Sequence, residues 1–204
     1  MKKLWTEAYR PDTVEGYVFR DEEQRKQINE WVSSGSIPHV LLSGSPGTGK
    51  TTLAKILVKA LGVQGHDFMM LNASRTNSVD DVRDRIVNFA GTIPFGDFKI
   101  VLLDEGDYLS HNAQAALRGV MEEFADNCRF IITCNYPNKI IPAIHSRSQS
   151  IHIPKLDRVA FTERVATVLI SEGVDIDLDT LDIYISASYP DLRKCLNSVQ
   201  QNSV

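Results

Sequence analysis

The residues best suited to chemistry form one stretch, Gly44-Ser45-Pro46-Gly47-Thr48-Gly49-Lys50-Thr51. It matches the pattern G-x-x-x-x-G-K-[ST], in which glycines let several backbone N–H groups point at one anion. In this pattern the lysine reaches the β- and γ-phosphates, and the threonine hydroxyl coordinates Mg²⁺. A glycine turn that happens to precede a helix is the alternative, which we disfavour because every motif position is filled. The stretch therefore predicts a loop that binds ATP and Mg²⁺.

A second candidate site lies roughly 50 residues further on, where an apolar run over residues 99–105 ends in Asp104 and Glu105. A carboxylate at such a strand end can hold Mg²⁺, and a second one can polarise the attacking water. We assign the first role to Asp104 and the second to Glu105. The alternative is a surface acidic pair that only closes a strand.

The phosphate loop and the two carboxylates must be positioned by the fold around them. Up to residue 154, the chain alternates strand and helix patterns. This alternation predicts an α/β fold with a doubly wound, five-stranded parallel sheet, which binds its ligand at the carboxyl ends of the strands. The expected strands cover 39–43, 68–72, 99–105, 129–135 and 150–153. The expected helices cover 21–34, 51–61, a segment starting at Ser78 or Asp80, and 110–125.

The alternation stops at residue 155, and three successive helices are expected at 157–172, 177–188 and 191–201. We therefore divide the chain into a nucleotide-binding core, residues 1–154, and a small three-helix domain, residues 155–204. Composition alone favours a loosely packed arm for the opening segment before residue 21.

Bulk properties set limits on function. The length of 204 residues suits either one large domain or one domain plus a small one, and a net charge of −4 restricts any nucleic-acid contact to a local surface. No apolar run approaches the roughly 20 residues of a membrane helix, so a cytoplasmic location and no membrane partner are expected. Three irregularly spaced cysteines, Cys128, Cys134 and Cys195, are expected to be reduced core residues.

Several motifs in order resemble one known family: Tyr9-Arg10-Pro11, the phosphate loop, Asn72-Ala73-Ser74, Asp104-Glu105, Gln114-Ala115-Ala116-Leu117-Arg118, Thr133-Cys134-Asn135, Ser146-Arg147 and Pro190-Asp191-Leu192-Arg193-Lys194. Together they resemble the clamp-loader ATPase subunits of the AAA+ superfamily. Replication factor C small subunits and the principal ATPase subunit of T-even phage clamp loaders are the nearest types. The resemblance covers roughly Thr6 to Gln201.

The resemblance implies roles beyond the two motifs. Asn135 takes the sensor position near the γ-phosphate, Arg147 the arginine finger, and Arg193 the sensor of the helical lid. Gln114 and Arg118 lie on the helix that couples the site to neighbouring subunits, whereas Arg75 and the helix bearing Arg83 face DNA. Nucleotide contacts are implied for Thr6, Glu7, Ala8, Tyr9, Arg10, Val18 and Thr52.

The implied partners are a sliding clamp, primer–template DNA and other loader subunits. The family's third, helical collar domain is not found in this sequence, and Ser148 and Pro190 replace a usual cysteine and glycine. Two alternatives stay open: another DNA-remodelling AAA+ ATPase, such as a junction motor or helicase loader, and a scaffold that binds nucleotide without useful turnover. The phage-like pattern also suggests a phage protein in its host's cytoplasm.

Overall fold

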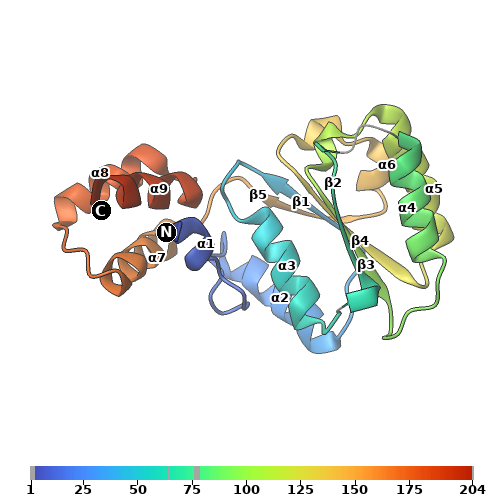
Figure 1. Cartoon of the computed structure of the whole chain (residues 1–204), viewed down its shortest axis with the longest axis horizontal. Helices are drawn as coiled ribbons and strands as arrows, with labels where there is room; N and C mark the ends of the chain where they lie inside the picture. Colours follow the sequence, from blue (N-terminus) through green and yellow to red (C-terminus); the bar gives the residue numbers. More distant parts are fainter. Residues whose placement is uncertain (1–2, 64, 76–78, 204) are drawn as a thin grey trace.

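The computed structural model describes residues 3–63, 65–75 and 79–203. Five parallel strands form one sheet in the order β2-β3-β4-β1-β5 (Figure 1). The strands are β1 (Val40–Gly44), β2 (Phe68–Asn72), β3 (Lys99–Asp104), β4 (Cys128–Cys134) and β5 (Gln149–Ile153). The predicted fold class and strand positions are confirmed, and each strand begins and ends within one residue of its predicted bound.

Helices cover both faces of the sheet. On one face lie α2 (Glu22–Ser34) and α3 (Lys50–Ala60); on the other lie α4 (Val79–Ala90), α5 (His111–Glu123) and the short α6 (Pro142–His145) (Figure 1). Alternate residues of β1 point to opposite sides, because side chains alternate along a strand. Val40 and Leu42 join the hydrophobic cluster on the α3 side, and Leu41 joins the cluster on the α4–α5 side.

Side-chain caps fix the helix starts near the expected residues. Asp21 accepts a 2.8 Å hydrogen bond from the N–H of Gln24 and begins α2, and the left-handed Gly35 ends it. Ser110 likewise caps α5 through the N–H of Ala113. For the helix expected to start at Ser78 or Asp80, the structure assigns α4 from Val79, so Asp80 lies inside it, and Ser78 lies outside the described residues.

Three helices follow the sheet and form what we call the lid: α7 (Arg158–Ser171), α8 (Leu178–Ser188) and α9 (Leu192–Ser203). They gather at one end of the molecule beside β5 (Figure 1). The lid shares one hydrophobic cluster with the α3 face of the sheet, including Phe161 and Val165. The three-helix region agrees with the sequence, whereas the boundary at residue 154 stays a proposal.

The opening segment is not a loosely packed arm, so that interpretation is wrong. Trp5, in α1 (Trp5–Ala8), is 3% exposed, and its backbone N–H donates a 2.9 Å hydrogen bond to Oε1 of Gln200 in α9. Tyr17 and Phe19 are also buried and contact each other edge to face. Trp5, Tyr17 and Phe19 are buried because they pack in one hydrophobic cluster with residues of α3 and of the lid, which are distant in sequence.

Three short 3₁₀ turns, η1 (Gly65–Asp67), η2 (Gly106–Tyr108) and η3 (Pro137–Lys139), were not predicted, nor were α1 and α6. Elements of three or four residues carry no readable periodicity. The three cysteines are free and buried, as expected. Among the described helices, none is long and apolar enough to cross a bilayer.

Candidate active site

The sheet order brings three predicted site segments together. Strand β4 lies between β1 and β3, with Leu42 paired to Thr133 and Leu103 paired to Ile132. The phosphate loop after β1 and the Asp104 carboxylate that ends β3 therefore flank the end of β4, which leads into Asn135. The predicted convergence at the carboxyl edge is confirmed.

The phosphate loop is fixed by the close approach of Asp191 and by hydrogen bonds of Thr48. Gly47 has φ 73°, and a Cβ there would lie 1.8 Å from Oδ1 of Asp191, so only glycine fits. Thr48 donates a 2.8 Å hydrogen bond from Oγ1 to the carbonyl of Ser45, and its own carbonyl accepts a 3.1 Å bond from the Tyr17 hydroxyl. Burial raises the pKa of Tyr17, which extends the range in which the hydroxyl can donate further into alkaline pH.

Lys50 opens α3 and folds back over the loop. Its Nζ donates to the carbonyl oxygens of Gly44 at 2.9 Å and Ser45 at 2.7 Å. Burial lowers the pKa of Lys50, while the neighbouring carboxylates of Asp104 and Asp107 oppose that shift. The ammonium group therefore lies within the loop that the sequence assigned to phosphates.

Two predicted metal ligands meet directly. Thr51 donates from Oγ1 to Oδ1 of Asp104 at 2.6 Å, and the same oxygen accepts a 2.7 Å bond from Thr133. Mg²⁺ prefers oxygen ligands and is usually held by one or two protein groups plus phosphate and water. This donor pair fits that pattern, and no larger metal-binding cluster of His, Cys, Asp and Glu occurs in the described part of the chain.

The backbone of Glu105 has a left-handed conformation, which residues other than glycine rarely adopt. It has φ 59° and ψ 43°, and it is the one described non-glycine residue with positive φ. Its N–H donates a 3.1 Å bond to Oγ1 of Thr133, which anchors the turn to β4. Such conformations cost on the order of 1–3 kcal/mol and gather at functional sites. The half-buried carboxylate faces the same cleft as Lys50 and Asn135.

Two adjoining clefts meet at the loop. One, of about 350 Å³, is polar and contains the phosphate-end candidates, including Pro46, Thr51, Asp104, Glu105 and Asn135. The other, of about 70 Å³, is mainly apolar and is bounded by Thr6, Tyr9, Tyr17, Val18 and Thr48, among others. Both clefts are lined by Arg10, Gly47, Gly49, Thr52 and Arg193. The lid and opening segment thus close over the phosphate loop.

Some predicted residues do not line these clefts. Glu7 and Ala8 are exposed, and Glu7 accepts a 2.7 Å bond from Arg10. Ser45 instead donates from its hydroxyl to the carbonyl of Pro154. Arg147 lies elsewhere: its Nε donates to Oε1 of Glu122 at 2.7 Å, and Nη1 donates to the carbonyl of Ala143 at 2.9 Å.

The residues expected to couple subunits, Gln114 and Arg118, and those expected to face DNA, Arg75 and Arg83, differ in burial. Gln114 is 2% exposed and bonds the carbonyl of Leu109 at 3.0 Å and that of Lys139 at 2.9 Å, whereas Arg118 is exposed. Arg75 is exposed at the rim of the polar cleft. Arg83 is exposed on α4, 3.8 Å from Asp84.

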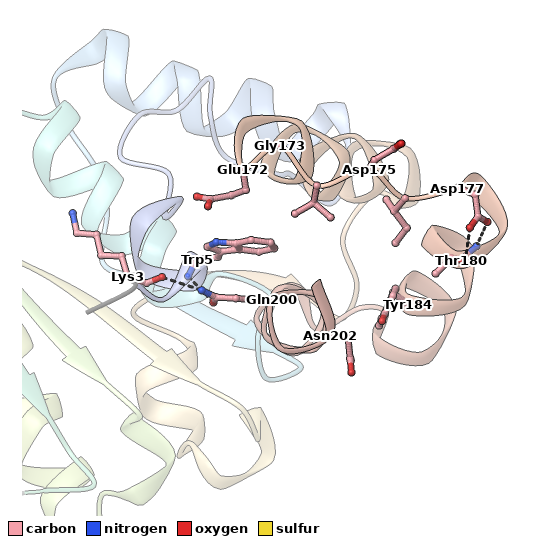
Figure 2. Close-up of a pocket in the computed structure, with 12 residues that line it drawn as sticks. Lys3, Trp5, Glu172, Gly173, Asp175, Asp177, Thr180, Tyr184, Gln200 and Asn202 are labelled. Atoms are coloured by element: carbon pink, nitrogen blue, oxygen red, sulfur yellow. Dashed lines mark hydrogen bonds between the residues drawn. The ribbon is translucent and has the colours of Figure 1, made fainter. Parts of the chain in front are cut away.

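A larger cleft, of about 1000 Å³, lies away from the phosphate loop and the strand-end carboxylates. It is bounded by α1, the α7–α8 connection and α9, with Trp5, Glu172 and Gln200 among its walls (Figure 2). None of the phosphate-loop or strand-end residues lines it. The predicted phosphate-binding and acidic residues instead converge in the smaller polar cleft.

Sequence reasoning gave no role to three residues of the site. Thr133 bridges Asp104 to the Glu105 backbone, Tyr17 supports the loop, and Asp107 accepts bonds from the N–H groups of Asn135 and Tyr136. Each acts through a partner far away in sequence. The available signals were a threonine one residue inside the end of β4 and an acidic residue just after the Asp-Glu pair.

The fold and site define the class of phosphate-loop nucleotide-binding proteins with a helical lid. Residues 40–155 match the model of the family described as "ATPase family associated with various cellular activities (AAA)". The chain belongs to this AAA family.

Several relatives with high similarity are replication factor C small subunits. Replication factor C small subunits from Methanocella arvoryzae, Methanococcus maripaludis and Archaeoglobus fulgidus are 42%, 40% and 41% identical. The matches cover 97%, 98% and 97% of this chain but 62%, 64% and 63% of the relatives. The chain therefore spans somewhat under two thirds of their length.

Among solved structures, the RuvB Holliday junction branch migration motor of Thermotoga maritima matches with a TM-score of 0.76. The match covers 95% of this chain and 65% of that protein at 18% identity. At this identity the similarity supports the shared fold only.

Proposed function

We propose that this chain is an ATPase subunit of a sliding-clamp loader, which uses ATP to open a clamp and place it on primer–template DNA. One observation carries the proposal: about 40% identity to replication factor C small subunits over nearly the whole chain. The site geometry is compatible with it, because the groups needed for phosphate binding and water activation line one cleft.

The proposed chemistry assigns a task to each group. Lys50 and the N–H groups of the loop bind the β- and γ-phosphates, Thr51 and Asp104 hold Mg²⁺, and Glu105 accepts a proton from the attacking water. When bound, Mg²⁺ neutralises charge on the phosphate oxygens. Asn135 contacts the γ-phosphate or the water, and Arg193 in the lid contacts the nucleotide from the other side.

The position of Arg147 favours hydrolysis between subunits. It lines neither cleft of its own chain and is half-buried in an ion pair with Glu122. A finger supplied by a neighbouring subunit makes turnover depend on assembly. We therefore propose other loader subunits as partners, together with clamp and DNA, and Arg75 and Arg83 as phosphate contacts.

The location and the domain boundary remain proposals too. We propose a cytoplasmic protein with a core over residues 1–154 and a lid domain over 155–204. The three relatives named above come from cellular organisms and give the suggested phage origin no support.

Turnover with defined additives tests the function. The ATPase rate is measured alone, with primed DNA, with a sliding clamp of the replication factor C system, and with both together. A clamp loader is expected to be stimulated most by clamp and DNA together. Stimulation by a four-way junction and not by the clamp would favour the junction motor. ATP binding without turnover under every condition would favour the scaffold, despite the presence of Glu105.

A further inference from the structure

Asp107, in η2, is a buried carboxylate to which the proposed chemistry gives no task. It is 7% exposed, and its Oδ2 accepts hydrogen bonds from the backbone N–H groups of Asn135 at 3.3 Å and Tyr136 at 3.2 Å. Its Oδ1 is also buried and accepts no hydrogen bond from the described residues. Burying a carboxylate is unfavourable unless its bonds compensate, so this position calls for an explanation.

The turn that carries Asp107 also carries Glu105. The N–H of Tyr108 donates a 3.0 Å bond to the carbonyl of Glu105, which closes the turn. Gly106 between them lies so close to β4 that a Cβ would be 2.6 Å from Cγ2 of Ile132. The turn is therefore wedged against the strand that leads into Asn135.

Two separate links thus join the two sides of the reaction cleft. On one side of the turn, the N–H of Glu105 donates to Thr133; on the other, Asp107 accepts from the N–H groups of Asn135 and Tyr136. The backbone between Thr133 and Tyr136 is therefore fixed against the Glu105 turn at both ends. Neither side can shift without breaking one of these partly buried hydrogen bonds.

We propose that Asp107 is a positioning residue that holds Asn135 at a fixed place relative to Glu105. The catalytic part of this inference rests on the proposed function, since it matters only if Asn135 and Glu105 act on one γ-phosphate and its attacking water. Positioning of reacting groups is sensitive, and a shift of about 1 Å can cost up to roughly 100-fold in rate.

The chain offers a matched control in Asp67. This carboxylate is 4% exposed and also holds a loop, by accepting bonds from the N–H of Phe95 at 2.9–3.0 Å and of Gly96 at 2.8 Å. Asp67 precedes β2, whereas the reaction cleft lies at the opposite, carboxyl edge of the sheet. If removing any buried carboxylate lowered turnover, substitutions of Asp67 and of Asp107 would both show that loss.

The first measurement is residue-resolved amide exchange on the nucleotide-free full chain. Asp107→Ala should speed exchange at Asn135 and Tyr136 by about tenfold or more, the scale of one lost bond to a charged acceptor. Asp107→Asn keeps an oxygen acceptor and should change these rates less. Asp67→Asn should speed exchange at Phe95 and Gly96 only. Unchanged rates at Asn135 and Tyr136 in both Asp107 variants would overturn the proposal.

The second measurement is a double-mutant cycle on turnover in the assembled complex. Asp107→Asn should lower kcat by about 10-fold with KM within about twofold, whereas Asp67→Asn should keep the parent kcat. In an Asn135→Ala background, Asp107→Asn should have no further effect beyond about twofold, because the group it positions is gone. Full additivity of the two losses would overturn the inference.

The two proposals fail in different ways. If the parent chain hydrolyses no ATP under any condition, the proposed function fails, while the exchange rates still decide whether Asp107 holds Asn135. If the parent is active but the cycle is additive, the function stands and the positioning role is lost. Should Asp107→Ala fail to fold, Asp107→Asn carries both measurements.

Discussion

Arg147 forms an ion pair with Glu122 of its own chain, with Nε donating to Oε1 at 2.7 Å. Glu122 lies near the end of α5 and Arg147 lies between α6 and β5, so the pair joins two elements on the side of the sheet away from α3. The guanidinium group is half-buried, and within the described residues its hydrogen bonds go to Glu122, Ala143 and Ser146, none of which belongs to the phosphate loop. On the proposed function, this arginine would act on the nucleotide of a neighbouring subunit rather than on its own.

Arg147→Ala should bind ATP like the parent and lose turnover in the assembled complex by about 10³-fold, because a finger stabilises charge on the transferring phosphoryl group. Lys50→Ala should also be inactive, but through loss of phosphate binding. Mixing the two inactive variants should restore part of the rate, since some interfaces then combine an intact loop with an intact arginine.

The control for this experiment is Arg25→Ala, which removes an exposed arginine of α2 and should keep full activity. The measurements are ATP affinity, complex formation and steady-state hydrolysis at high protein concentration. No recovery on mixing, despite demonstrated co-assembly, would reject the role in trans. If the Arg147→Ala variant alone kept full activity, Arg147 would have no role in turnover.

Glu105→Gln should separate binding from chemistry. The substitution keeps the size of the side chain but removes the base, so ATP affinity should stay within about threefold and turnover should fall by about 10²-fold or more. Glu30→Gln, on the exposed side of α2, is the matched control and should change neither. Equilibrium nucleotide binding and single-turnover hydrolysis check the prediction. Parent-like turnover would place the base on another residue.

Combined Arg75→Ala and Arg83→Ala should weaken DNA binding equally for all sequences. Contacts to phosphate depend on salt, and each lost contact should reduce the slope of log affinity against log salt by about 1. Because Arg75 also lines the polar cleft, Arg83→Ala is measured alone as well, and it should keep normal ATP binding. A loss confined to one DNA sequence would contradict contacts to the backbone.

The three thiols should be unreactive in the folded chain. Burial raises the pKa of Cys128 and Cys134 to about 12 and that of Cys195 to about 11, from an ordinary value of 9.0. A shift of three units lowers the thiolate fraction at pH 8 by about 10³-fold. A thiol reagent should therefore label none of them quickly before unfolding and all three in denaturant. Rapid labelling of native Cys134 would contradict the packing at the end of β4.

The same shifts predict how stability depends on pH. The unfolded chain releases thiol protons near pH 9, whereas the folded chain keeps them until about pH 11–12. The contribution to stability is therefore complete below pH 9 and is lost as the pH rises from 9 toward 12. Cys134→Ala should make the alkaline fall in the free energy of unfolding shallower. Denaturant unfolding at a series of pH values measures this.

The sequence alone determined those features that neighbouring residues decide among themselves. Alternating apolar residues, caps such as Asp21 and turns such as Gly35 located nearly every long helix and strand, because the information lies within one element. The loop from Gly44 to Thr51 and the pair Asp104-Glu105 were found for the same reason. Parallel pairing also followed, since strand–helix alternation favours it.

The tertiary structure alone decided which distant residues meet. Because β4 lies between β1 and β3, the Thr133 hydroxyl donates to Asp104 and the Asn135 N–H donates to Asp107. No local sequence pattern specifies that strand order or its register. Burial of Trp5 likewise depends on α9, almost two hundred residues away. These contacts arise from packing between elements, where many residues jointly decide the arrangement, so a single stretch of sequence carries too little information to predict them.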